Sequence, residues 1–245
     1  MFNLLIKRLS LSSLLGFLLF ASNAMADFDE ILAKECPKIQ SYNSKGSELY
    51  KQKDYVKARE QFNLQVGWAE SCDVESNLIA TAYNNVAITY LREKQYLKAK
   101  AWLSLAAEDK KSLYNTSRNK SAIDAAQQIA NQSITGEYWR YAGVGIWNTI
   151  IVDKLDGKYK INFWGYRVNQ RTLYYGPNMG EFEVILPVDN NRAIYDQRLF
   201  KESDDECVFD FEFSPGQITL LQKGNGNCGF GMGVYAGGSY IKVGE

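Results

Sequence analysis

One pattern is written twice in this chain: residues 42–62 read YNSKGSELYKQKDYVKAREQF, and residues 83–103 read YNNVAITYLREKQYLKAKAWL. Matching positions of the two copies keep matching residue types. Large residues recur as Tyr42/Tyr83, Leu49/Tyr90, Tyr55/Tyr96 and Phe62/Leu103, small ones as Gly46/Ala87 and Ala58/Ala99, and lysines as Lys53/Lys94 and Lys57/Lys98. Small residues at fixed places let antiparallel helices approach closely, while large residues fill the space between hairpins. The pattern therefore predicts two stacked helical hairpins.

The repeat resembles the tetratricopeptide repeat, most clearly where Tyr50-Lys-Gln-Lys-Asp-Tyr-Val-Lys-Ala matches Leu91-Arg-Glu-Lys-Gln-Tyr-Leu-Lys-Ala. The resemblance covers about a quarter of the chain, residues 42–106, and implies a scaffold that binds proteins. The sequence departs from the family in its period, which runs from Tyr42 to Tyr83 and exceeds the family's period of about 34. It departs again at Gln65, where the family prefers a small residue such as Ala106. About three repeats are normally needed for stability, so we expect flanking helices at 27–40 and 119–132 to act as caps.

The register of that family implies that the first helix of each hairpin lines a concave face. Six side chains would then face a groove: Asn43, Ser47, Tyr50, Asn84, Ile88 and Leu91. Their mixture of amides and apolar anchors suits a peptide or protein partner. The alternative is that the N-terminal helix or the C-terminal part of the chain fills the groove, because two repeats make only a short trough.

The segment 1–26 has the pattern of a cleaved secretory signal peptide. Lys7 and Arg8 precede an apolar run at 9–20, and the small residues Ala24 and Ala26 fit the rule for cleavage before residue 27. A retained membrane anchor is the alternative, although the run is short for a bilayer. We therefore expect an exported protein, most simply a periplasmic one, with no membrane span after cleavage.

Charge and the absence of histidine narrow the classes of function. Lys7 and Arg8 leave with the signal peptide, so 26 of the 28 basic residues stand against 28 acidic ones, and no basic run remains. This balance argues against a nucleic-acid partner. The chain contains no histidine, which removes Ser-His-Asp and Cys-His catalysis and the commonest metal ligand. We expect no enzyme, no cofactor and no metal site. A carbohydrate-active enzyme that uses paired carboxylates is an open alternative.

The four cysteines fall two on each side of residue 136. In an oxidising compartment this arrangement favours one disulfide within each part, Cys36 with Cys72 and Cys207 with Cys228. Three pairings are formally possible, and pairing within each part needs no contact between the parts. A zinc site is disfavoured because neither pair has C-x-x-C spacing and histidine is absent.

The apolar period changes from helical to alternating after residue 136, so we expect a helical repeat domain at 27–133 and an antiparallel β domain at 134–245. Apolar side chains alternate at Tyr159, Ile161 and Phe163, and again at Cys207, Phe209, Phe211 and Phe213. Turn signals at 155–157, 176–178, 189–191, 214–216 and 224–226 divide the rest into seven or eight short strands. The chain is thus expected to be α+β, with a small antiparallel barrel or sandwich after the helices.

Two motifs that suggest ligands have simpler interpretations. Gly224, Gly226 and Gly229 satisfy G-x-G-x-x-G, but the glycine-rich segment that follows is unsuited to the helix that a dinucleotide site needs. The acidic run 202–206 lacks the ligand spacing of a calcium loop. We expect a glycine-rich turn at the first motif and a solvated turn at the second.

Aromatic residues are dense after residue 138, and most are expected in the core. Tyr174 and Tyr175 are adjacent, so both cannot face inward, and an exposed tyrosine suits a protein partner. The sequence predicts a non-catalytic exported protein-binding module, most simply an inhibitor or immunity protein that occludes a cell-wall-degrading enzyme or toxin. That step is an analogy at the level of the fold. An adaptor in envelope assembly or polysaccharide handling is the alternative.

Overall fold

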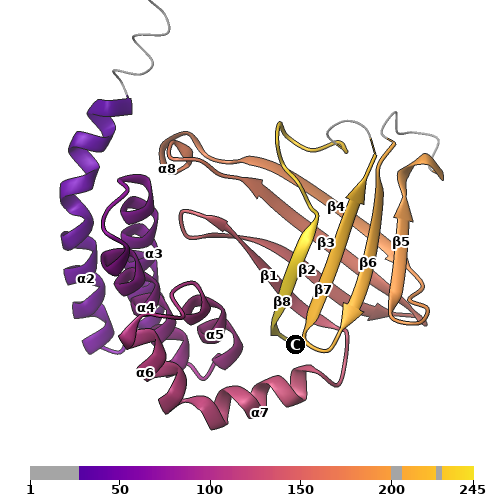
Figure 1. The fold of residues 1–245 in the computed structure, drawn as a ribbon, viewed down its shortest axis with the longest axis horizontal. Coiled ribbons are helices and arrows are strands. Elements are labelled where there is room, and N and C mark those ends of the chain that lie inside the picture. The colour runs from indigo at the N-terminus through magenta and orange to yellow at the C-terminus, as the bar shows by residue number, and fades with distance from the viewer. Residues whose placement is uncertain (1–27, 200–205, 225–227) are drawn as a thin grey trace, which may run out of the picture.

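The structure is a computed structural model that describes residues 28–199, 206–224 and 228–245. A layer of helices lies along one side of an eight-stranded antiparallel sheet that curls into a nearly closed barrel (Figure 1). The α+β class is therefore confirmed. The expected signal peptide lies outside the described residues. Within those ranges, no helix is long and apolar enough to cross a membrane.

The helical layer is one run of short helices joined by tight turns. It comprises 28–35, the 3-10 turn η1 (Cys36–Lys38), α2 (Ile39–Lys51), α3 (Tyr55–Ser71), α4 (Ser76–Arg92), α5 (Tyr96–Ser104), α6 (Lys110–Arg118) and α7 (Lys120–Ala130). Pro37 is expected to end the first helix, and the α-helix does end at residue 35, but the chain stays helical beyond it. Pro37 sits in the first turn of η1, where the missing N–H of proline is tolerated, so the helical run continues into α2.

The two copies of the repeated pattern form matching hairpins, α2–α3 and α4–α5. Lys53 and Lys94 both adopt a left-handed backbone, with φ of 65° and 60°. After each, the N–H of Asp54 or Gln95 donates to the carbonyl oxygen five residues earlier, at 3.0 and 2.9 Å. Gly46 lies against Phe62, where an added Cβ would come within 2.5 Å of the ring. The small residue is therefore required for the close approach of α2 and α3.

Two further helices, α6 and α7, extend the layer beyond the repeated pattern. Helix α7 fits the expected cap at 119–132, whereas α6 was not predicted from the sequence. The Asp109 side chain caps α6 by accepting hydrogen bonds from the backbone N–H groups of Lys111 and Ser112, at 2.9 and 3.1 Å. Helix α6 contacts α4, and α7 contacts α5.

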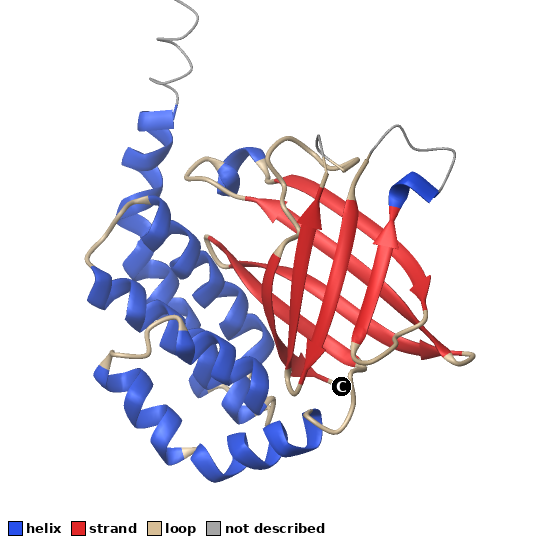
Figure 2. Cartoon of the chain, turned by 45° about the vertical axis from the view of Figure 1, so that its right-hand side comes forward, coloured by secondary structure: helices blue, strands red, loops and turns tan. Residues whose placement is uncertain are grey.

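The barrel strands follow the chain around the sheet. They are β1 (Gly136–Gly143), β2 (Ile146–Leu155), β3 (Lys158–Arg167), β4 (Asn178–Leu186), β5 (Arg192–Asp196), β6 (Val208–Ser214), β7 (Gln217–Lys223) and β8 (Gly238–Gly244). A single helical turn, α8 (Thr172–Tyr175), precedes β4, and the 3-10 turn η2 (Gln197–Leu199) follows β5. The hydrogen-bonded order is β4-β3-β2-β1-β8-β7-β6-β5, with antiparallel neighbours throughout. The sheet is therefore an up-and-down barrel (Figure 2). We call the place where its two end strands, β4 and β5, meet without pairing the seam.

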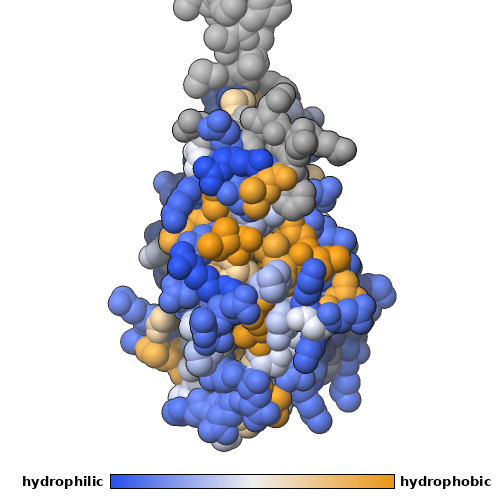
Figure 3. Space-filling model, turned by 90° about the vertical axis from the view of Figure 1, so that its right-hand side faces the viewer, coloured by the Kyte–Doolittle hydropathy of each residue, from blue (hydrophilic) through white to orange (hydrophobic). Residues whose placement is uncertain are grey.

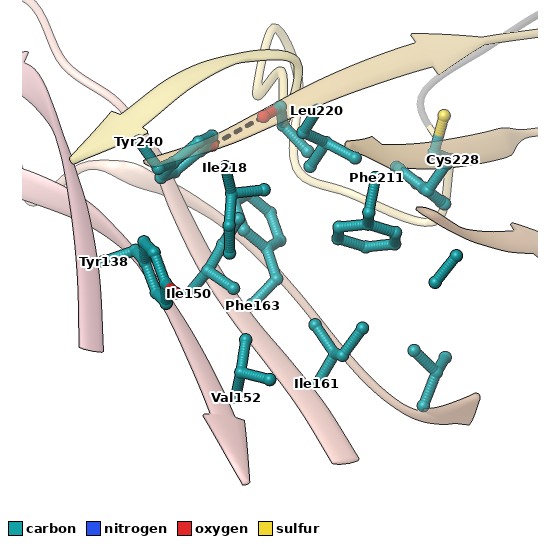
Figure 4. Packing of buried hydrophobic residues seen from close by; sticks show 14 of the residues in the cluster. Tyr138, Ile150, Val152, Ile161, Phe163, Phe211, Ile218, Leu220, Cys228 and Tyr240 are labelled. Carbon is teal, nitrogen blue, oxygen red and sulfur yellow. Dashed lines mark hydrogen bonds between the residues drawn. The ribbon is translucent and has the colours of Figure 1, made fainter. Parts of the chain in front are cut away.

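The barrel interior is filled with apolar side chains, as the alternating pattern predicts. Ile161 and Phe163 of β3 meet Phe209, Phe211 and other inward residues of the opposite strands (Figure 4). An eight-stranded barrel is narrow enough for side chains to fill it. Both predicted disulfides are present, Cys36–Cys72 between η1 and the end of α3, and Cys207–Cys228 between the start of β6 and the β7–β8 connection.

The helices rest on the outer face of β1, β2 and β8 through a shared apolar cluster. Trp102 of α5 contacts the ring of Trp147 at a centroid distance of 5.4 Å, and Tyr90 of α4 contacts Trp139 at 6.3 Å. Buried Lys242 of β8 adds a polar link, since its Nζ donates to the carbonyl oxygens of residues 130 and 133 after α7. The helical core thus includes residues of the barrel.

Candidate functional site

One end of the barrel gathers its long connections. In an up-and-down order, the β1–β2, β3–β4, β5–β6 and β7–β8 connections all emerge at the same end. The β3–β4 connection carries α8, and the β7–β8 connection spans 224–237 (Figure 1). The opposite end has the short turns after β2, β4 and β6. Loops held by a rigid sheet are common binding elements.

The β3–β4 connection is fixed from beneath. Asn169 begins its turn by accepting the N–H of Arg171 at 2.8 Å, and the Asn169 N–H donates to the Thr172 hydroxyl at 2.8 Å. Leu173 packs against Gly67 of α3, where an added Cβ would come within 2.8 Å of the leucine. The next two residues, Tyr174 and Tyr175, are exposed.

The β7–β8 connection is fixed by a different set of contacts. Cys228 is held by its disulfide, and Phe230 inserts into the barrel core at 5.6 Å from the ring of Phe163. The Gly231 N–H donates to the carbonyl oxygen of Met179 at 2.8 Å, so the two backbones approach closely at a position that has no side chain. The Asn178 side chain donates to the carbonyl oxygen of Met232 at 2.7 Å.

Exposed apolar side chains lie at this end of the barrel, on α8, the start of β4, η2 and the β7–β8 connection, and we call this set the loop-end patch: Tyr174, Tyr175, Met179, Leu199, Met232 and Tyr235. Met232 and Leu199 are 77% and 76% exposed, and the two adjacent tyrosines 60% and 57%. The prediction that at least one tyrosine of that pair is exposed is confirmed. Their rings contact each other edge to face at 4.9 Å. Sequence reasoning missed the other four residues because each is isolated in the chain and only the barrel brings them to one end.

The six groove residues predicted from the repeat are spread over α2 and α4. Asn43 accepts a hydrogen bond from Asn85 at 2.9 Å, and the Tyr50 hydroxyl accepts one from Arg92 at 2.6 Å. Ser47, Ile88 and Leu91 are partly exposed on the same two helices. Much of this face is therefore occupied by contacts between the hairpins.

Asn84 does not lie in an open groove. It is buried, and its Oδ1 accepts a hydrogen bond from Asn115 of α6 at 2.8 Å. Helix α6 covers this side of α4. Gln65, the polar residue at a position where the related family prefers a small one, is also buried and accepts a hydrogen bond from Asn85 at 3.0 Å.

Glu70, at the C-terminal end of α3, collects donors from both parts of the chain. Its carboxylate accepts hydrogen bonds from the hydroxyls of Tyr83 and Tyr141, and from the backbone N–H of Val144 at 2.8 Å. Burial and the neighbouring carboxylate raise the pKa of both phenols, which keeps them protonated as donors. The cluster joins α3 to the β1–β2 turn, which is a structural role.

The remaining candidates offer less to a ligand. A surface hollow lies between α5, α7 and the end of β8, and there Lys98 and Glu137 bind each other at 2.7 Å. The acidic run 202–206 lies outside the described residues except for Glu206. In the part of the chain that the structure describes, the segment after Gly229 forms no helix, so the required helix of a dinucleotide site is not seen there.

No family model, curated protein or solved structure matches this chain. The likeness to the tetratricopeptide repeat therefore stays a prediction from the sequence, alongside the observed pair of matching hairpins.

Proposed function

We propose that this chain is a non-catalytic exported module that binds a partner protein through the loop-end patch. The observation that carries the proposal is that tyrosine, methionine and leucine side chains are exposed on several elements at one end of the barrel. Tyrosine is enriched among residues that dominate binding energy, and methionine adapts to irregular apolar surfaces. Exposed apolar patches on folded proteins commonly mark such interfaces.

The most specific form of this function is a periplasmic inhibitor or immunity protein. Connections held at the end of a barrel suit insertion into the cleft of an enzyme, because little conformational entropy is lost on binding. The two disulfides are compatible with export to an oxidising compartment. A cell-wall-degrading enzyme or toxin is the partner class that we propose.

The test begins with a photo-crosslinking amino acid at position 174 in the exported chain, compared with the same group at position 114. Tyr114 of α6 is a matched control because it is 59% exposed and distant in the fold from the barrel end. We expect a discrete cross-linked protein at position 174 and none at 114. Equal labelling at both positions would contradict the proposal.

The isolated partner then decides between inhibitor and adaptor. Stoichiometric loss of a lytic activity supports the inhibitor, whereas recovery of a multi-protein envelope complex with no loss of activity supports the adaptor. The double variant Tyr174→Ala/Met232→Ala should weaken binding about thirtyfold, on the order of 2 kcal/mol, if these side chains dominate the interface. The control Leu113→Ala/Tyr114→Ala should leave the affinity unchanged.

A further inference from the structure

The seam of the barrel has two strand edges that face each other without forming a ladder. β4 and β5 are the two ends of the hydrogen-bonded strand order. They are linked by a turn in which Asp189 and Arg192 exchange backbone hydrogen bonds at 3.0 and 2.9 Å. Pairing stops there. In the register of that turn, the next hydrogen-bonded pair would be Pro187 with Ile194, and proline has no N–H to donate.

One backbone hydrogen bond of β4 shows which of its backbone groups face the seam. The carbonyl oxygen of Met179 points away from β3, because it accepts the N–H of Gly231. Alternate residues of an antiparallel strand direct both backbone groups to the same side. Glu181, Glu183 and Ile185 therefore present their N–H and C=O groups to the seam.

The same reasoning applies to β5. Asn191 accepts the N–H of Phe213, and Gln197 donates to the carbonyl oxygen of Cys207, so these odd-numbered residues face the β6 side. Ile194 and Asp196 then face the seam. Inside the barrel, Phe182 and Tyr195 contact each other at 5.9 Å, so side chains close the interior behind the seam.

The outer surface at the seam combines acidic and apolar side chains. Glu181 and Glu183 are exposed, and Lys160 neutralises Glu183 in part at 3.1 Å. Ile185 and Ile194 are about half exposed, at 49% and 51%. Apolar side chains gather on this side of the molecule (Figure 3). Natural proteins usually cover or blunt such an edge, since an unpaired edge pairs readily with another strand.

We propose that the edge of β4 from Glu181 to Ile185 binds an extended segment of a different polypeptide, with Lys or Arg at alternating positions. The segment would add a strand by backbone hydrogen bonds, and its basic side chains would pair with the two exposed glutamates. A second copy of this chain fits poorly, because antiparallel pairing of two β4 edges about Glu183 places like charges opposite each other. This surface adjoins the loop-end patch at Met179 but shares no residue with it, so either proposal can fail while the other stands.

The test uses the full mature chain and a synthetic ten-residue peptide of alternating Lys and Val. A peptide of alternating Glu and Val is the charge control, and an N-methylated Lys-Val peptide is the backbone control. Fluorescence anisotropy measures binding, and amide hydrogen exchange reports protection at Glu181, Glu183 and Ile185. We expect saturable binding and protection with the Lys-Val peptide only.

A charge-reversed variant sharpens the result without depending on a disrupted fold. Glu181→Lys/Glu183→Lys alters exposed side chains and should weaken Lys-Val binding about tenfold while improving Glu-Val binding. Absence of saturable binding would overturn the proposal, and so would binding without protection of β4. Equal binding of the N-methylated peptide would show a charge effect alone and would also overturn it. Sedimentation that reveals a dimer with these amides already protected would identify a second copy as the occupant instead.

Discussion

The barrel and the helical layer build their cores in different ways. The barrel core is drawn entirely from residues between 134 and 240. The helical core is completed by side chains from the outer face of the barrel, namely Trp139, Tyr141, Trp147, Ile241 and Val243. Tyr138 and Trp139 are neighbours in β1 and point to opposite faces, so one strand serves both cores. We therefore expect the barrel to close without the helices, and the helices to depend on the barrel.

The largest loss of stability is expected when the helical layer is separated from the barrel. We expect the fragment 134–245 to fold, with β circular dichroism and dispersed amide resonances, because its core is self-contained. The fragment 27–133 should be helical but without a cooperative thermal transition, since it loses the aromatic side chains that complete its core. Each such side chain buries about 150–250 Å².

Mixing the fragments provides the control for that experiment. Addition of 134–245 should restore a cooperative transition to 27–133 if the shared cluster is the missing element. A helical fragment that unfolds cooperatively by itself would show that its own residues suffice, and the comparison between the two cores would then be wrong.

A smaller effect is expected from Trp139→Ala. Trp139 is buried between the layers and contacts Tyr90 and Trp147, so its removal should cost about 3 kcal/mol in the helical layer. Hydrogen exchange should accelerate in α4 and α5 and change little in the barrel. The matched variant Phe211→Ala, inside the barrel, should accelerate exchange in both parts. If both variants accelerated exchange equally in the helices and in the barrel, the idea that only the helices depend on the other part would be wrong.

The sequence predicted the features that depend on local pattern. The repeat located both hairpins, because Gly46 is set by the close approach of two helices and Lys53 by the geometry of the tight turn between them. Alternation located the strands with inward residues such as Phe163 and Phe211. The disulfides also followed, since each pair joins segments within one part of the chain.

The features that were missed depend on contacts between distant segments. Nothing near Trp139 in the sequence indicates that its partner is Tyr90, far earlier in the chain, because alternation specifies only that the two faces of β1 differ. Asn84 matched a groove position by register, yet an unpredicted helix covers it. The loop-end patch is likewise assembled from separate connections by strand order, and strand order was not predicted.

The hydrogen bonds that Glu70 accepts from the barrel are expected to contribute less to stability than the aromatic contacts between the layers. In Glu70→Gln the charged acceptor shared by Tyr83, Tyr141 and Val144 becomes an amide whose NH₂ group faces a donor. We expect the free energy of unfolding to fall by about 1–3 kcal/mol. Urea denaturation of the full chain, followed by tryptophan fluorescence, measures the change.

Glu75→Gln is the matched control for the Glu70 variant. Glu75 is exposed and makes no side-chain hydrogen bond at the start of α4, so its effect should stay within about 0.5 kcal/mol. Ultraviolet titration adds a second readout. Loss of the Glu70 charge should lower the raised pKa of Tyr141, because that charge opposes ionisation of the phenol.

The smallest effect is expected within the barrel, at Asp210. Arg192 of β5 holds this buried carboxylate with two hydrogen bonds, at 2.7 and 2.5 Å, and lowers its pKa. An unfolded Asp has a pKa of about 3.9. The pair therefore stabilises the barrel fully above that pH, and the contribution is lost as pH falls through the lowered pKa of the folded state.

Asp210→Asn should make the barrel less stable at neutral pH and flatten its loss of stability below about pH 4, because no carboxylate remains there to be protonated. Acid titration of the full chain, monitored by near-ultraviolet circular dichroism, tests this. Since β5 has only β6 as a ladder partner, the ion pair secures a strand that the seam leaves open on its other side. Hydrogen exchange in the variant should therefore rise first in β5. A uniform rise in exchange across all the strands would show instead that β5 is held as firmly as the others. The barrel would then behave as a closed cylinder, although no ladder joins β4 to β5.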